Sequence, residues 1–128
     1  IATPEGYEPD ASAVEWARRQ GANIIHTHDP LNAARGADVL NTDVWASMGQ
    51  EKEQEKRRRD FAGFQLNANT LAAANSGSLV LHCLPAHRGE EITDKVIEGP
   101  NSVVFDEAEN RLHVQKAIMA TLMQNAKE

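Results

Sequence analysis

The segment 81–93, LHCLPAHRGEEIT, gathers side chains that could do chemistry around Cys83, the only cysteine of the chain. Three kinds of site would place a cysteine beside a histidine: a nucleophilic Cys/His pair, a metal site, or a strand end whose thiol lines a substrate pocket. Adjacent strand residues point to opposite faces, so His82 is badly placed to activate Cys83. The histidines match no zinc-motif spacing. A pocket residue and a buried structural thiol remain.

A second group of candidate residues follows a predicted strand at 43–49, DVWASMG. It places a carboxylate (Asp43), a hydroxyl (Ser47) and a glycine close together. Such a group could bind the amine and the carboxylate of an amino acid. The alternative is an ordinary loop in which Asp43 caps an element and Trp45 packs in the core.

Arg111 is the third candidate, in or just before the first turn of the predicted last helix. Free backbone N–H groups and the helix dipole favour an anion there, and a guanidinium would add a planar set of donors. The alternative is a surface salt bridge with Glu107 or Glu109.

The elements that must position these residues alternate along the chain. Strands are predicted at 1–3, 22–29, 37–40, 78–85 and 101–107. Helices are predicted at 10–21, 30–36, 50–64, 65–77, 90–100 and 108–128, with Asp10 and Asn67 as caps. Alternation of this kind indicates parallel strands joined by crossover helices, hence an α/β fold. Ligands of such sheets bind beyond the carboxyl ends of the strands, here 41–49, 82–89 and 106–111.

Length and composition indicate one globular domain: the 128 residues are 41% hydrophobic and 25% charged. The net charge of -6 argues against a nucleic-acid partner, which needs a basic surface. A single cysteine favours a reducing compartment, and no run approaches the roughly 20 apolar residues of a membrane span. We therefore expect a cytoplasmic protein without a membrane partner. Because the chain starts with Ile1 inside a predicted strand, we also expect a fragment.

Three segments, DVWASMG, HCLPAHRGEE and FDEAENRLHVQKAIMATLM, resemble in order and spacing the second half of the ornithine carbamoyltransferase family. The resemblance covers essentially the whole chain, and the SMG loop sets it apart from relatives that use aspartate or putrescine. It implies a Rossmann-like parallel sheet flanked by helices, the second domain of the aspartate/ornithine carbamoyltransferase fold, truncated at its N-terminal edge. Residues 1–128 would be a partial ornithine-binding domain, with the carbamoyl-phosphate domain absent.

The resemblance implies transfer of the carbamoyl group of carbamoyl phosphate to L-ornithine, giving L-citrulline and phosphate in an anabolic, arginine-biosynthesis type of enzyme. Asp43, together with Ser47 and Met48, would bind ornithine. Cys83 and Leu84 would line the place where the amine attacks. By the same resemblance, Asp43, Cys83 and a third residue that contacts carbamoyl phosphate, Arg111, would be the catalytic groups.

The resemblance further implies no metal and no organic cofactor. The intact protein would be a homotrimer or a multiple of trimers, in the cytoplasm or, in a eukaryote, the mitochondrial matrix. Two alternatives stay open: a carbamoyltransferase for another amine, and a non-catalytic α/β module that binds an amino acid.

We predict that residues 1–128, expressed alone, form no citrulline. By the resemblance, the motifs that hold the phosphate lie in an amino-terminal domain outside these residues, so carbamoyl phosphate would lack most of its site. Mass-spectrometric detection of citrulline, in a preparation from a host without the enzyme, provides the measurement. Turnover above the blank would contradict the prediction.

Overall fold

The computed structural model describes residues 1–46 and 53–125 and confirms the α/β fold. Its elements, in chain order, are α1 (Ala11–Arg19), α2 (Pro30–Ala34), β1 (Val39–Thr42), α3 (Gln54–Asp60), α4 (Ala68–Ala73), β2 (Leu79–His82), α5 (Asp94–Ile97) and α6 (Val104–Asn125). The helices predicted around 10–21, 30–36, 50–64, 65–77 and 90–100 are all present, in shorter form.

The two strands form the predicted parallel pair. Their register runs from Val39 opposite Leu79 to Thr42 opposite His82. Helices α3 and α4 lie in the crossover between β1 and β2, as a parallel pair requires. The buried apolar core surrounds this pair and the helices beside it, and its members are Ala34, Leu40, Leu66, Val80, Ile92, Val96, Ile97 and Val104.

Local hydrogen bonds explain where two of the helices begin. The Asp10 carboxylate accepts from the Ala13 N–H at 2.8 Å, and the Asn67 side chain accepts from two N–H groups of the first turn of α4. Both residues satisfy backbone donors that have no partner within the helix. Both predicted caps are therefore confirmed.

The strand predicted at 22–29 is wrong. Only Thr27 pairs, in a single bridge to Ala2, and Ile25 is 66% exposed. The β-branched residues of this segment favour a strand only where a partner strand and a covered face exist. The predicted first strand, 1–3, is likewise reduced to that one bridge.

The strand predicted at 101–107 is also wrong. Ser102 bridges Val80 of β2, and the chain then turns directly into α6 at Val104. Acidic side chains at Asp106 and Glu107 in the first turn favour the helix through its dipole. The last helix therefore starts about one turn earlier than predicted.

The strand predicted at 37–40 is present but lies two residues later, at Val39–Thr42. Leu40 faces the core and is 9% exposed, whereas Val39 is 48% exposed. The shift makes Asp43 the first residue after the strand. The sheet thus delivers the candidate carboxylate to its carboxyl edge.

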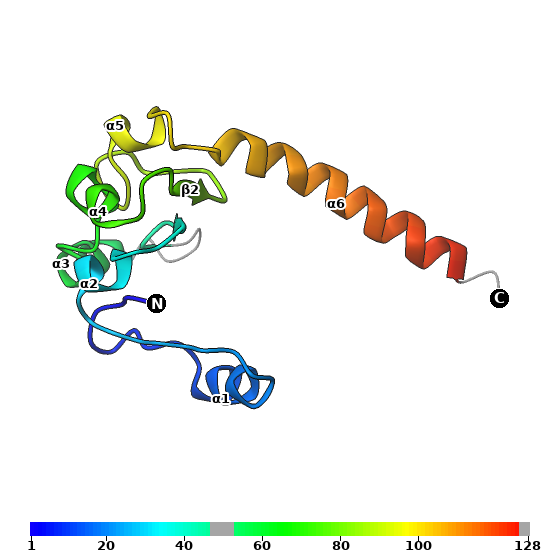
Figure 1. The fold of residues 1–128 in the computed structure, drawn as a ribbon, viewed down its shortest axis with the longest axis horizontal. Helices are drawn as coiled ribbons and strands as arrows, with labels where there is room; N and C mark the ends of the chain where they lie inside the picture. Colours follow the sequence, from blue (N-terminus) through cyan, green and yellow to red (C-terminus); the bar gives the residue numbers. More distant parts are fainter. Residues whose placement is uncertain (47–52, 126–128) are drawn as a thin grey trace.

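Helix α6 projects away from the rest of the chain, as Figure 1 shows. Only its start is packed: Val104 is fully buried, whereas Leu112, Ile118 and Leu122 are 56%, 53% and 64% exposed. These apolar side chains of α6 are thus not covered by any of the described residues. Among residues 1–46 and 53–125, no helix combines the length and apolar character that crossing a membrane requires.

Candidate active site

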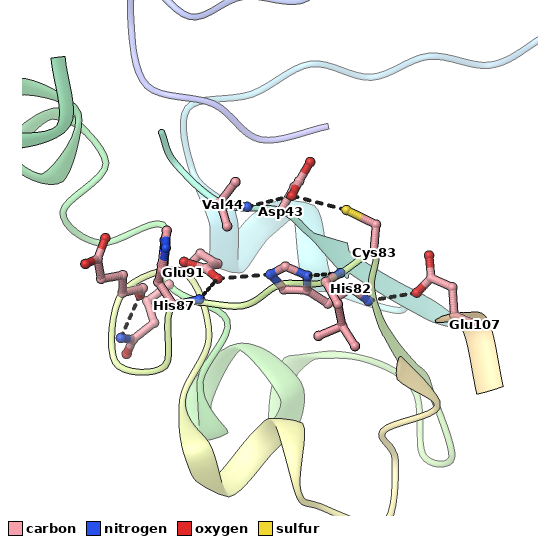
Figure 2. Close-up of polar contacts among 10 residues, drawn as sticks. Asp43, Val44, His82, Cys83, His87, Glu91 and Glu107 are labelled. Atoms are coloured by element: carbon pink, nitrogen blue, oxygen red, sulfur yellow. Dashed lines mark hydrogen bonds and ion pairs between the residues drawn. The ribbon is translucent and has the colours of Figure 1, made fainter. Parts of the chain in front are cut away.

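The carboxyl ends of β1 and β2 bring Asp43 and Cys83 into contact. The Cys83 thiol donates to the Asp43 Oδ1 at 3.3 Å, and the Val44 N–H donates to the same oxygen at 2.8 Å (Figure 2). The register explains the contact, because Thr42 lies opposite His82 and each candidate residue follows directly. Both residues thus lie at the carboxyl edge of the sheet, where the sequence predicted that a ligand would bind.

The protein around the thiol disfavours its ionisation. Burial raises the pKa of Cys83, and the hydrogen bond and charge of Asp43, with the charge of Glu107, raise it further. A cysteine nucleophile needs a lowered pKa and a base within reach. Cys83 is exposed to solvent. It is therefore not the buried structural thiol that the sequence allowed. The geometry favours the pocket interpretation.

His82 points away from Cys83, into the core. Its side chain is fully buried, with Nε2 at 2.9 Å from the Glu91 Oε1, and its Nδ1 accepts from the Leu84 N–H at 2.9 Å (Figure 2). The imidazole is therefore engaged elsewhere and does not contact the thiol. The prediction that neighbouring strand residues would separate these groups is confirmed.

Leu84 has an unusual backbone conformation. Its φ is 55°, and the peptide bond between Leu84 and Pro85 is cis. A positive φ brings the Cβ of a non-glycine residue close to the following carbonyl, at a cost of about 1–2 kcal/mol. Neighbouring contacts must hold the residue in this conformation.

Two cavities adjoin the Asp43–Cys83 contact. Cys83 and Arg111 line a cavity of about 500 Å³ between β2 and the start of α6. Its other lining residues are Leu81, Val103, Asp106, Glu107, Ala108, Asn110 and Val114. Asp43 lines a second cavity, of about 270 Å³, beside α3. The hydrogen bond thus links a residue that lines one cavity to a residue that lines the other.

Arg111 shares a cavity with Cys83, but the predicted reason for its role is wrong. It lies about two turns beyond Val104, the first residue of α6, and the helix dipole acts mainly within the first turn. Within the described part of the chain, Arg111 makes no ion pair with Glu107 or Glu109 either. Arg111 therefore brings positive charge to the cavity from the side of the helix.

The segment after β1 is held from α3. The Arg57 Nη1 donates to the Trp45 carbonyl at 3.1 Å, and the Trp45 ring stacks on Phe61 with centroids 5.9 Å apart. Trp45 is half-buried against Phe61 and is not among the core residues, so the alternative interpretation of this loop, which put Trp45 in the core, is wrong on this point. The two remaining candidate residues, Ser47 and Met48, lie outside the described residues.

Two carboxylates that support the site were missed from the sequence. The Glu107 Oε2 accepts from the His82 N–H at 2.9 Å, although Glu107 was considered only as a partner for Arg111. Glu91 is fully buried beside His82. Glu107 fell within the predicted strand end at 106–111, which was a usable signal, whereas the burial of Glu91 within a polar GEE segment has none.

Two groups of side chains have metal-ligating atoms close together: Asp43, His82 and Cys83, and His87, Glu90 and Glu91. Both ring nitrogens of His82 already take part in hydrogen bonds, and the Glu90 carboxylate pairs with Arg58. A metal at either group would have to displace these contacts. That the reaction uses no metal stays a prediction.

Parallel strands that end in a carboxylate and a thiol, beside two cavities, define a Rossmann-like α/β ligand-binding domain. Residues 1–122 match the family described as aspartate/ornithine carbamoyltransferase, Asp/Orn binding domain. The chain belongs to this family.

Several relatives are similar over nearly the whole chain. An ornithine carbamoyltransferase of Syntrophotalea carbinolica is 68% identical, over 96% of this chain and 41% of the relative. The structure of ornithine carbamoyltransferase from Pyrococcus furiosus matches with 55% identity and a TM-score of 0.85, over 94% of this chain and 40% of that one. Anabolic ornithine carbamoyltransferase from Campylobacter jejuni matches with 38% identity and a TM-score of 0.90, over 98% and 43%. The chain thus spans only 40–43% of these proteins.

The Asp43–Cys83 contact predicts how fast the thiol reacts. Asp43→Asn removes the negative charge that raises the thiol pKa, so more thiolate is present at pH 8 and alkylation by iodoacetamide should speed up roughly threefold to tenfold. Peptide mass spectrometry across pH 7–9.5 measures the rate at Cys83.

Glu15→Gln is the matched control, since this α1 carboxylate is exposed and pairs with Arg19. It should leave the rate at Cys83 unchanged. Equal rates in wild type and Asp43→Asn would show that the carboxylate does not act on the thiol.

Proposed function

We propose that residues 1–128 are the ornithine-binding domain of an ornithine carbamoyltransferase, which transfers the carbamoyl group of carbamoyl phosphate to L-ornithine. The observation that carries the proposal is the Asp43–Cys83 contact at the carboxyl edge of the sheet, in a chain of this family. The names of its relatives support ornithine as the amine.

The contact suits an amine substrate. A primary alkylammonium has a pKa near 10, so it must lose a proton before its nitrogen can attack a carbonyl carbon. In this proposal the Asp43 carboxylate attracts the ammonium group, and Cys83 orients the nitrogen and assists the proton's departure. Leu84 completes the ornithine site together with Ser47 and Met48, which follow Asp43 in the sequence. No covalent bond to sulfur is formed.

Arg111 serves the other substrate. Attack on the carbamoyl carbon creates a tetrahedral oxyanion, which a fixed positive charge stabilises. Arg111 reaches the cavity that Cys83 lines, so its guanidinium is available to carbamoyl phosphate and to this oxyanion. Phosphate leaves when the tetrahedral intermediate collapses to citrulline.

The rest of the intact protein supplies what these residues lack. Because the chain spans about 41% of its relative in Syntrophotalea carbinolica, we assign most phosphate contacts to the other part of the protein. We propose a homotrimer or a multiple of trimers, in the cytoplasm or, in a eukaryote, the mitochondrial matrix. The reaction itself needs no metal or organic cofactor.

Asp43→Asn in the full-length enzyme tests the proposed role of the carboxylate. Removing a charged partner of the ammonium should lower kcat/KM for ornithine by roughly 10–100-fold, while carbamoyl phosphate affinity changes less than about threefold. Steady-state kinetics give the first quantity and calorimetry the second. Equal losses for both substrates would count against the assignment, as would a preference of the wild-type enzyme for putrescine or aspartate.

Cys83→Ser distinguishes a pocket residue from a nucleophile. A nucleophile is indispensable, whereas loss of assistance to proton transfer costs about 10²–10⁴-fold or less. We expect measurable citrulline formation, weaker ornithine binding and a changed pH profile. An inactive variant that still binds both substrates at every pH, or a carbamoylated Cys83 trapped from wild type, would refute the pocket role.

A further inference from the structure

The ring of His82 holds the backbone of the residue two positions ahead. A backbone N–H can only donate, so the Leu84 N–H at 2.9 Å makes Nδ1 an acceptor without a proton. The proton of the neutral ring therefore sits on Nε2, which donates to the Glu91 Oε1 at 2.9 Å. The direction of each hydrogen bond is thereby set.

Glu91 in turn holds the ring in place. Its Oε1 also accepts from the His87 N–H at 2.6 Å, so one oxygen ties the imidazole to the loop that follows Leu84. His82 and Glu91 are both fully buried. Hydrogen bonds in such surroundings meet little competition from water and keep their direction.

Burying the His82–Glu91 pair in the core costs free energy. Glu91 Oε2 has no hydrogen-bond partner among residues 1–46 and 53–125, and burying a carboxylate in this way is unfavourable. Replacing both partners of a buried hydrogen bond by apolar groups of the same shape is often nearly neutral for stability. Stability alone does not explain this choice of residues.

The contacts clamp the backbone on both sides of Cys83. Before it, the His82 N–H is held by the Glu107 Oε2 of α6 at 2.9 Å. After it, the Leu84 N–H is held by the His82 ring, in the conformation with φ of 55°. In Figure 2 the Cys83 thiol points toward Asp43, whereas the His82 ring points toward Glu91. The direction of the thiol therefore depends on the two clamped neighbours.

We propose that the buried His82–Glu91 pair is a positioning device, which fixes the Leu84 backbone and the Cys83 thiol for the amine of the substrate. Neither side chain touches the substrate. The inference deepens the proposed function and rests on it, since the amine is that of ornithine.

The test uses Glu91→Leu and Glu91→Gln in the full-length enzyme. Leucine fills the space but cannot accept from His82, so the ring is free to turn. We expect a folded protein whose kcat falls about tenfold and whose ornithine KM rises, with carbamoyl phosphate affinity within about twofold of wild type. Glutamine keeps an acceptor oxygen and should restore kcat to within about threefold.

A second pair of variants separates positioning from stability. The two variants are His82→Asn and His82→Gln. Asparagine keeps an acceptor near the place of Nδ1, whereas glutamine keeps a donor near the place of Nε2. His82→Asn leaves Glu91 unpaired and should melt at the lower temperature, yet it should be the more active of the two. A structural role predicts the opposite, activity that follows melting temperature. Activity that follows melting temperature in the His82 variants overturns the inference. Wild-type kinetics in Glu91→Leu would overturn it as well.

The alkylation rate of Cys83 keeps the two proposals distinguishable. If the clamp is lost, the thiol leaves Asp43 and should react several-fold faster with iodoacetamide in Glu91→Leu than in Glu91→Gln. This holds whether or not the protein forms citrulline. A wild-type protein that forms no citrulline contradicts the proposed function, whereas equal alkylation rates in these two variants contradict the positioning role. If neither Glu91 variant folds, the His82 pair decides in the same assays.

Discussion

The register of one parallel strand pair is the constraint on which the site depends. Because Thr42 lies opposite His82, the next residue of each strand reaches the same edge of the sheet. A shift by one residue would turn every side chain to the other face and separate Asp43 from Cys83. Apolar residues such as Leu40 and Val80 oppose such a shift, since each is buried only in this register. The packing of the core is therefore also what aligns the polar groups.

The same strand end combines two opposite environments. Cys83 and Asp43 are exposed to the cavities, while His82, one residue earlier, lies in the core with a carboxylate. Alternation along a strand makes this separation possible over a single residue. A polar pair in the core has little to add to stability, but its hydrogen bonds are directional in a way that apolar contacts are not. The core thus specifies orientation as well as burial.

The sequence was most informative where local chemistry decides the structure. Caps such as Asn67 act through their own side chain, and the alternation of elements requires parallel pairing, so both were predictable. The strand at 101–107 was not, because its hydrophobic residues suit a strand or the buried start of a helix equally well. Because the start of the last helix was predicted too late, Arg111 was wrongly placed in or just before its first turn. The burial of Glu91 depends on contacts between distant segments, which no local pattern records.

The attachment of α6 has a consequence for how finely the site can be aligned. Among its described residues only Val104, the first one, is buried, and the 22-residue helix extends from there. At 1.5 Å per residue the helix is about 33 Å long, and Arg111 lies about 10 Å from its start. A pivot of about 5° at the first turn would thus move the far end by about 3 Å but the Arg111 backbone by less than about 1 Å. A displacement of the far end of α6 therefore reaches the Arg111 backbone reduced about threefold, so the position of the guanidinium-bearing turn is the less sensitive of the two to the tilt of the helix.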